Sequence, residues 1–308
     1  MKVLPIILII GLGNFIRARG LLSSGTIDEL KWLVVNAALP AVLFIAFLDM
    51  ELEAAFIGLF AFVFFSCAAL LGYGYLLRRI LSIKHDYYPH LMTGFEMGMV
   101  GISLFGTAYG ISNVGYMAVV DLAHELFIWF VLVTILVAKR DGVSSFSGTL
   151  KGFITSPLII AIIAALVLNL LGLREWFRGM IVGKAVVETF TFLGDLLIPA
   201  ILIIIGYGMK LSREGVRAAL GVVVTRFIVL IPLALPVSIF VVRALDIDPA
   251  FEAALFTFFI LPPPYIVPLF MRKDQTEERT YANNVLSVYT AISLVIFIVY
   301  FALNPTLG

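Results

Sequence analysis

Long apolar runs alternate with short polar loops along almost the whole chain. A hydrocarbon layer about 30 Å thick is crossed by roughly 20 apolar residues in a helix. By that measure the pattern predicts ten membrane spans, at about 3–16, 30–49, 54–80, 88–110, 114–138, 153–172, 185–208, 215–243, 250–271 and 283–304. The loops between them are too short to form a soluble domain. We therefore expect an all-α integral membrane protein whose function resides in its helices.

The two halves of the chain share several marks. Spans two and seven each carry an X-Pro pair, Leu39-Pro40 and Ile198-Pro199, at nearly the same distance before a closing methionine. Span four is interrupted by glycines and span nine by prolines. Because five spans reverse the direction of the chain, the second copy of such a unit must be inverted. The predicted organisation is a first five-helix repeat at 1–138, a cytoplasmic linker at 139–152 and a second five-helix repeat at 153–308.

The interruptions predict the position of a binding site. Successive prolines cannot continue an α-helix, and irregular backbone at membrane depth survives only inside protein or beside a wet cavity. The N-termini of half-helices favour anions. We therefore expect a substrate site where residues 98–104 and 261–266 approach each other. The candidate substrate ligands are Asn36, Gly98, Gly101, Ser103, Pro263, Pro264, Tyr265 and Asn284, although Asn284 and its neighbour Asn283 open the last predicted span and could serve only as helix caps.

Composition and charge support the membrane assignment. The chain is 62% hydrophobic and 13% charged, whereas soluble domains are nearer half apolar and a quarter charged. The net charge of +1 argues against a nucleic-acid partner, and a single cysteine, Cys67, excludes an internal disulfide framework. Fifteen of the 21 basic residues fall in alternate loops on one side, which the positive-inside rule makes cytoplasmic. With ten spans, both termini then lie outside.

Ionisable residues within predicted spans are functional candidates because they are costly in lipid. Glu96 lies beside the first interruption, where it could bind a coupling cation or carry a proton. Asp121 and Glu125 share one face of span five with His124 beside them, and two carboxylates this close favour a shared proton. The alternative is that Asp121 is solvated near the outer surface. Asp195 and Arg226 either neutralise each other, or Arg226 attracts an organic anion. No metal site is expected, because no second histidine lies near His124.

Parts of the sequence resemble the auxin efflux carrier family, which belongs to a wider group that includes bile acid–sodium symporters. The similar segments are residues 11–22, the stretch Asn36-Ala-Ala-Leu-Pro-Ala-Val-Leu-Phe44 and the stretch Arg226-Phe-Ile-Val-Leu-Ile-Pro232. The resemblance implies crossed broken helices four and nine, a scaffold of helices 1, 2, 6 and 7, and a moving transport domain of helices 3–5 and 8–10. The family has Asn-x-Gly-x-x-Gly-x-Pro in the first broken helix, whereas this chain has Glu96 for the Asn and Ser103 for the Pro.

These observations predict a secondary transporter in the cell membrane, either plasma or inner. It would carry a small organic anion, such as an auxin-like or dicarboxylate compound, by an elevator-like motion coupled to H⁺ or Na⁺, without another cofactor. The alternatives are a carrier like the bile acid–sodium symporters and an uncoupled, potential-driven efflux carrier. The expected partners are the substrate and membrane lipids, and a homodimer through the scaffold helices is one open arrangement. We do not expect an enzyme, because the chain lacks a His-Glu-x-x-His or Gly-x-Ser-x-Gly motif.

Overall fold

The computed structural model describes residues 3–141, 148, 151–152, 154–208, 213–272 and 274–307. Every regular element in these ranges is a helix, which confirms the predicted all-helical class. Among the described residues, six helices are long and apolar enough to cross a membrane: Ser24–Asp49, Phe56–Ile80, Ile111–Arg140, Ile181–Gly208, Arg213–Leu245 and Thr276–Leu303. Four shorter apolar helices lie at Pro5–Ala18, Met97–Tyr109, Pro157–Leu170 and Ala250–Ile260. A multi-pass membrane protein fits this pattern, while the inverted repeat of ten spans stays a prediction.

Some of the predicted features lie outside the described residues. They include positions 142–147, 149 and 150 of the expected cytoplasmic linker, and residue 153, which was to open the second repeat. Lys2, Lys210 and Lys273, which entered the count of basic residues on the two sides, also lie outside.

The chain divides into two compact units. Unit 1 consists of Met1–Glu53, Gly98–Ala118 and Gly152–Gly208, and unit 2 consists of Ala54–Met97, Val119–Lys151 and Met209–Gly308. The helices expected to form the scaffold lie in unit 1. The division passes through predicted span four, which leaves its first part in unit 2 and its second part in unit 1.

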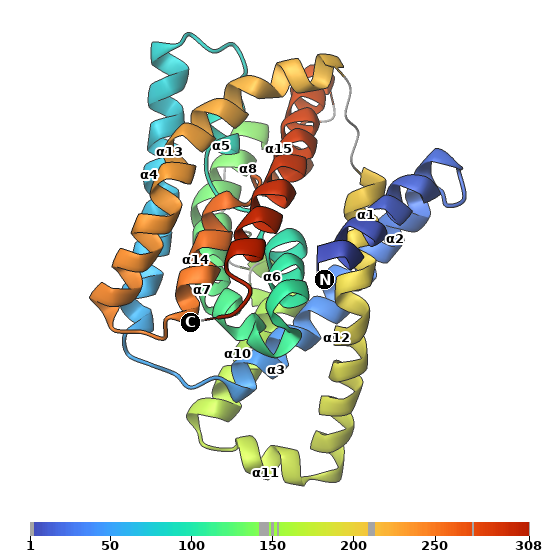
Figure 1. Cartoon of the computed structure of the whole chain (residues 1–308), viewed down its shortest axis with the longest axis vertical. Helices are drawn as coiled ribbons and strands as arrows, with labels where there is room; N and C mark the ends of the chain where they lie inside the picture. Colours follow the sequence, from blue (N-terminus) through green and yellow to red (C-terminus); the bar gives the residue numbers. More distant parts are fainter. Residues whose placement is uncertain are drawn as a thin grey trace. The chain divides into compact units, whose positions relative to one another are not determined.

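Unit 1 is built around the close packing of α1 (Val3–Ala18) against α12 (Ile181–Gly208), seen in blue and yellow in Figure 1. A Cβ atom at Gly13 would lie 2.2 Å from the carbonyl oxygen of Ile203, and one at Gly206 would lie 2.0 Å from that of Ile10. Two glycines therefore let the two backbones touch, as small residues do in many membrane helix pairs.

A second group of helices in unit 1 surrounds Pro40. The helices α2 (Ser24–Leu33), η1 (Val34–Ala38) and α3 (Leu39–Asp49) follow one another without a break, and α3 packs against α10 (Pro157–Leu170). Pro40 lies directly after the π-helical turn η1, a position where its missing N–H is tolerated. The amide of Asn169 donates to the carbonyl oxygens of Phe47 and Met50, at 2.8 and 2.7 Å, and so closes the end of α3. The remaining elements assigned wholly or mainly to this unit are η2 (Met97–Gly101), α6 (Ile102–Tyr109), η3 (Ile111–Asn113) and α11 (Arg174–Gly179).

Unit 2 is centred on the long helix α13 (Arg213–Leu245), which packs against α14 (Ala250–Ile260) and α15 (Thr276–Leu303) (Figure 1). Its other elements are α4 (Phe56–Ile80), α5 (Tyr88–Leu91), η4 (Ile128–Val133), α8 (Thr134–Asp141) and η5 (Val267–Leu269), and α7 (Val114–Phe127) belongs to it from Val119 onward.

One predicted helix start is wrong. α15 begins at Thr276, so Asn283 and Asn284 lie two turns inside the helix and do not cap it. The apolar pattern alone set the predicted start, because the polar first turns of α15 do not register as a membrane span.

Candidate functional site

The first interruption lies at residues 92–96, between α5 and η2, just before the segment 98–104 that was expected to line the substrate site. Gly94 marks it, because its φ of +66° belongs to the left-handed region that favours glycine. A Cβ atom on Gly94 would also lie 2.8 Å from the Cγ atom of Pro264. Gly98 and Gly101, which were expected to break the helix, instead lie in the helical turn η2.

The second interruption lies at residues 261–266, as predicted. Its three prolines are buried, and the chain turns through Tyr265 before the short helix η5. The phenol of Tyr265 lies 2.8 Å from the hydroxyl of Thr290 on α15, which anchors this turn within unit 2.

Glu96 joins the two interruptions. Its backbone N–H donates to the carbonyl oxygen of Pro262 at 2.8 Å, and its carboxylate Oε2 accepts the backbone N–H of Tyr265 at 2.7 Å. The carboxylate thus satisfies a backbone donor that the broken helix has freed. Glu96 is half-buried. Its observed contacts therefore give it a positioning role between two irregular segments.

Arg226 holds the same two segments from α13. Its side chain is fully buried and donates to the carbonyl oxygens of Leu91 at 3.1 Å, Gly94 at 2.6 Å and Leu261 at 3.4 Å. Its guanidinium carbon also lies 4.5 Å from the centre of the Phe95 ring and 5.2 Å from that of Tyr289, within cation–π range. Arg226 thus satisfies backbone carbonyls at both interruptions, and sequence reasoning did not identify these partners.

The ionisable cluster on α7 is also in unit 2. Ligand-capable atoms of Asp121, His124 and Glu125 all lie within 4.8 Å of one another. Asp121 and His124 are each only 2% exposed, so the alternative of a solvated Asp121 is wrong. The Nδ1 atom of His124 lies 3.4 Å from Oδ1 of Asp121. Neither oxygen of Asp121 has a hydrogen-bond partner within the described residues.

His124 connects this cluster to the first interruption. Its Nε2 atom accepts the backbone N–H of Phe95 at 2.9 Å. A backbone N–H can only donate, so Nε2 carries a lone pair and the ring proton of neutral His124 resides on Nδ1, toward Asp121. A metal ion bound at Nδ1 would require the proton to move to Nε2, where it would face the N–H of Phe95. We therefore assign no metal ion to this cluster.

Trp129, in η4, is a further neighbour of this cluster. Its indole N–H donates to Oε2 of Glu125 at 2.9 Å. The spacing of four residues on one helix was the available signal, since such residues share a face. Glu96 also interacts electrostatically with both His124 and Glu125, so the cluster and the interruptions form one electrostatic neighbourhood.

Most of the other predicted residues belong to unit 1. Asn36, in η1, donates to the carbonyl oxygen of Trp32 at 2.8 Å, and Ser103 is fully buried on α6. Both belong to unit 1, together with Gly98, Gly101 and the exposed Asp195 of α12. Asn284 is half-buried on α15 of unit 2, beside the exposed Asn283. The proposed neutralisation of Arg226 by Asp195 stays untested, because the two residues belong to different units.

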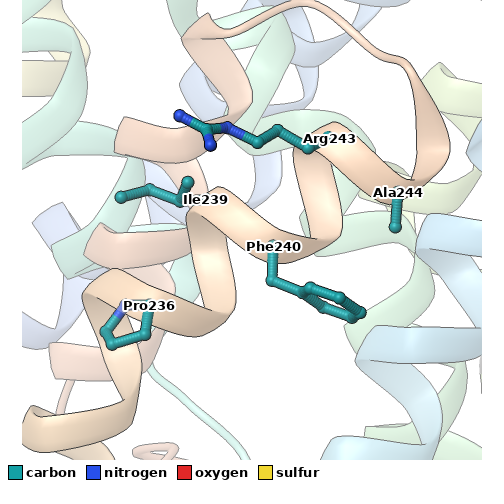
Figure 2. A pocket seen from close by; sticks show the side chains of 5 residues that line it. All are labelled: Pro236, Ile239, Phe240, Arg243 and Ala244. Carbon is teal, nitrogen blue, oxygen red and sulfur yellow. The ribbon is translucent and has the colours of Figure 1, made fainter.

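An open depression of about 460 Å³ lies along one stretch of α13 and is lined by Pro236, Ile239, Phe240, Arg243 and Ala244 (Figure 2). The sticks in Figure 2 all extend from this single helix, and none of them is a predicted site residue. Its apolar lining ends in one arginine, as expected of a surface that meets lipid chains and headgroups. We therefore do not place the substrate there.

Comparison with known proteins identifies a family. A family model described as membrane transport protein matches residues 1–301, almost the whole chain. No curated protein matches the chain.

Proposed function

The chain belongs to the membrane transport protein family, that of the auxin efflux carriers, and from this premise we propose that it is a secondary transporter of a small organic anion. The proposed substrate is an auxin-like or dicarboxylate compound, and the proposed location of the protein is the cell membrane, either plasma or inner. Membrane transport itself follows from the family. The substrate class, the coupling and the motion are the proposed part.

One observation carries the proposal. Two predicted spans are interrupted within unit 2, at residues 92–96 and 261–266, and Glu96 binds the second interruption through both its backbone and its side chain. Interrupted helices in corresponding positions are the usual place of a transporter's binding site. Since the terminal nitrogens of Arg226 donate to three backbone carbonyls and its side chain is fully buried, we assign the attraction for an anion to helix N-termini beside the interruptions.

Proton coupling is the form of coupling that the buried cluster supports best. Asp121 is a buried carboxylate whose oxygens find no hydrogen-bond donor in the part of the chain that the structure describes, and a proton would relieve that cost. Sodium coupling, as in a carrier like the bile acid–sodium symporters, and uncoupled potential-driven efflux are the competing forms.

The division into two units supports an elevator-like motion. Helices α1, α3, α10 and α12 all lie in unit 1 and are the expected scaffold, while both interruptions lie in unit 2. We propose that unit 2 carries the substrate. A ten-span inverted repeat with both termini outside, and a homodimer through scaffold helices, complete the proposed arrangement.

Reconstitution tests this function. The purified protein in liposomes is offered labelled indole carboxylates and dicarboxylates under a pH gradient, a sodium gradient or a membrane potential, with empty liposomes as the control. We expect saturable uptake that depends on the pH gradient. Saturable uptake that follows only sodium would select the symporter-like alternative. Uptake that follows only the potential would select uncoupled efflux, and discrete single-channel currents would replace the transporter by a channel.

A further inference from the structure

The bond between His124 and Phe95 links a titratable ring directly to the first interruption. The Nε2 lone pair accepts the Phe95 N–H at 2.9 Å, and Phe95 lies between Gly94, which is bound by Arg226, and Glu96, which is bound to Pro262 and Tyr265. A change at the ring is therefore transmitted to the peptide that orients Glu96.

We propose that His124 is a proton-linked positioning residue, and that a proton added to its Nε2 atom releases the Phe95 peptide and with it the pairing of the two interruptions. The inference rests on the proposed function only in calling this proton the coupling ion. The chemistry is a simple proton addition. The incoming proton takes the lone pair that now accepts the Phe95 N–H, so that bond breaks. The resulting imidazolium has two N–H donors, one directed at Asp121.

Burial disfavours an added charge on this ring, which is only 2% exposed, while nearby carboxylates favour it. From its own helix, Asp121 lies 3.4 Å away and Glu125 lies in the same cluster. From the first interruption Glu96 acts on the ring electrostatically, and from α13 Arg226 opposes the added charge. The Phe258 ring of α14, with its centroid 5.9 Å from that of the imidazole, contributes no charge.

The neutral and protonated forms thus differ in a definite way. In the neutral form the ring holds the first interruption in the observed conformation, and its Nδ1 lies 3.4 Å from Oδ1 of Asp121 without forming a hydrogen bond. In the protonated form the same Nδ1–H carries part of a positive charge and attracts the Asp121 carboxylate, while the Phe95 N–H loses its acceptor. A buried N–H without an acceptor is costly, so the peptide is expected to move. Protonation of His124 and the observed conformation of residues 92–96 therefore exclude each other. Adding the proton shifts the equilibrium away from that conformation.

Two measurements on the whole protein in lipid nanodiscs test the inference without any substrate. The chain has three histidines, His85, His90 and His124. In ¹⁵N-histidine NMR, the signals of His124 are identified as those that disappear in His124→Gln. For these signals in the unaltered protein, we expect an unprotonated Nε2 and a protonated Nδ1 at high pH, and an imidazolium at low pH. A bare Nδ1 at high pH, or a ring that stays neutral throughout the pH range of the folded protein, would overturn the proposal.

Hydrogen–deuterium exchange of the amide at Phe95 is the second measurement. After correction for intrinsic pH dependence, we expect exchange to become faster by about tenfold as the ring protonates, which is the loss of about one hydrogen bond. In His124→Gln the side-chain amide oxygen can still accept the Phe95 N–H but cannot take the proton, so exchange there should stay slow at all pH values. His90→Gln is the matched control, since His90 is equally buried but contacts Tyr75, and it should behave as the unaltered protein.

The role in coupling is read separately in liposomes. His124→Gln is expected to retain substrate exchange and lose its pH dependence, whereas His124→Ala, which also lacks the acceptor, should lose both. A pH dependence unchanged in His124→Gln would overturn the coupling role. If the unaltered protein transports nothing, the proposed function fails, and the NMR and exchange results still decide whether the ring controls the Phe95 peptide.

Discussion

Replacing Arg226 by methionine is expected to destabilise the protein strongly. Methionine keeps much of the length and apolar stem of the side chain but removes donors from the carbonyl oxygens of Leu91, Gly94 and Leu261, which lie 3.1, 2.6 and 3.4 Å from the guanidinium nitrogens. Each buried carbonyl left without a donor costs about 1–3 kcal/mol. The sum is about 3–7 kcal/mol, with the long bond to Leu261 counted at the low end.

Part of this loss is offset. A guanidinium that is fully buried and bonded to neutral carbonyls carries a desolvation cost of several kcal/mol, which methionine does not have. The cation–π contacts to Phe95 and Tyr289 reduce that cost by roughly 1–2 kcal/mol each. We therefore expect a net loss of about 2–4 kcal/mol, or roughly 3–6 °C in Tm for a chain of this size.

Thermal unfolding in detergent, followed by tryptophan fluorescence, measures this loss. Arg226→Lys serves as the graded variant, because it keeps the charge but not the planar fork, and it should fall between methionine and the unaltered protein. Asp195→Asn serves as the second control and should leave the Tm unchanged if Arg226 acts through carbonyls. A Tm of Arg226→Met equal to that of the unaltered protein would refute this reasoning, as would an equal fall in Asp195→Asn.

Three further predictions follow from particular contacts. Glu96→Gln keeps an acceptor for the Tyr265 N–H, so it should keep the normal stability yet lose coupled transport in liposomes. Glu96→Ala should lose about 1–3 kcal/mol of stability, measured in a thermal scan. Uptake with an unaltered pH profile in Glu96→Gln would remove the charge of Glu96 from the mechanism. Gly94→Ala combines a positive φ with an overlap on Pro264 and should cost about 2–4 kcal/mol, while Gly72→Ala, with open space at its Cβ, should be neutral; equal Tm values for the two would contradict this. Gly206→Ala should abolish the contact of α1 with α12 and lower the yield of folded protein, a result that normal yield would exclude.

The sequence was sufficient to predict the helical class and the second interruption. Three successive prolines cannot be accommodated in a continuous α-helix, so the break at 261–266 is a local property of the chain. The membrane family followed from short segments, and the family match over residues 1–301 confirms it. Features fixed by local chemistry were therefore predictable.

Predicted span four contains five glycines, and the sequence could not show which of them breaks the helix, because glycine is permissive and does not by itself break a helix. Gly98 and Gly106 are in helical turns, where their missing side chains make room for Leu39 and Ile198. Gly94 breaks the helix because Pro264 lies against it and Arg226 binds its carbonyl oxygen. Those neighbours are 132 or more positions away in the chain, so spacing alone could not separate the breaking glycine from the packing ones.

The partners of the charged residues were hidden for a related reason. Arg226 and His124 bind backbone atoms, of Gly94 and Phe95 among others, and backbone atoms leave no sign in residue identity. Charge pairing was the only available criterion, and it directed attention from Arg226 to Asp195. The cluster on α7 could be predicted because its members interact through side chains at helical spacing.

These contacts constrain how unit 2 can respond to a ligand. Arg226 and Glu96 satisfy backbone groups at both interruptions, so the two segments are held together and a change in one must be felt by the other. The His124 bond to Phe95 differs from these in one respect, because its acceptor can be removed by a single proton. An anion arriving beside the interruptions and a proton arriving at the cluster would therefore act on the same short stretch of backbone. Coupling between them requires no long pathway, only that the two conformations of residues 92–96 differ in their affinity for each.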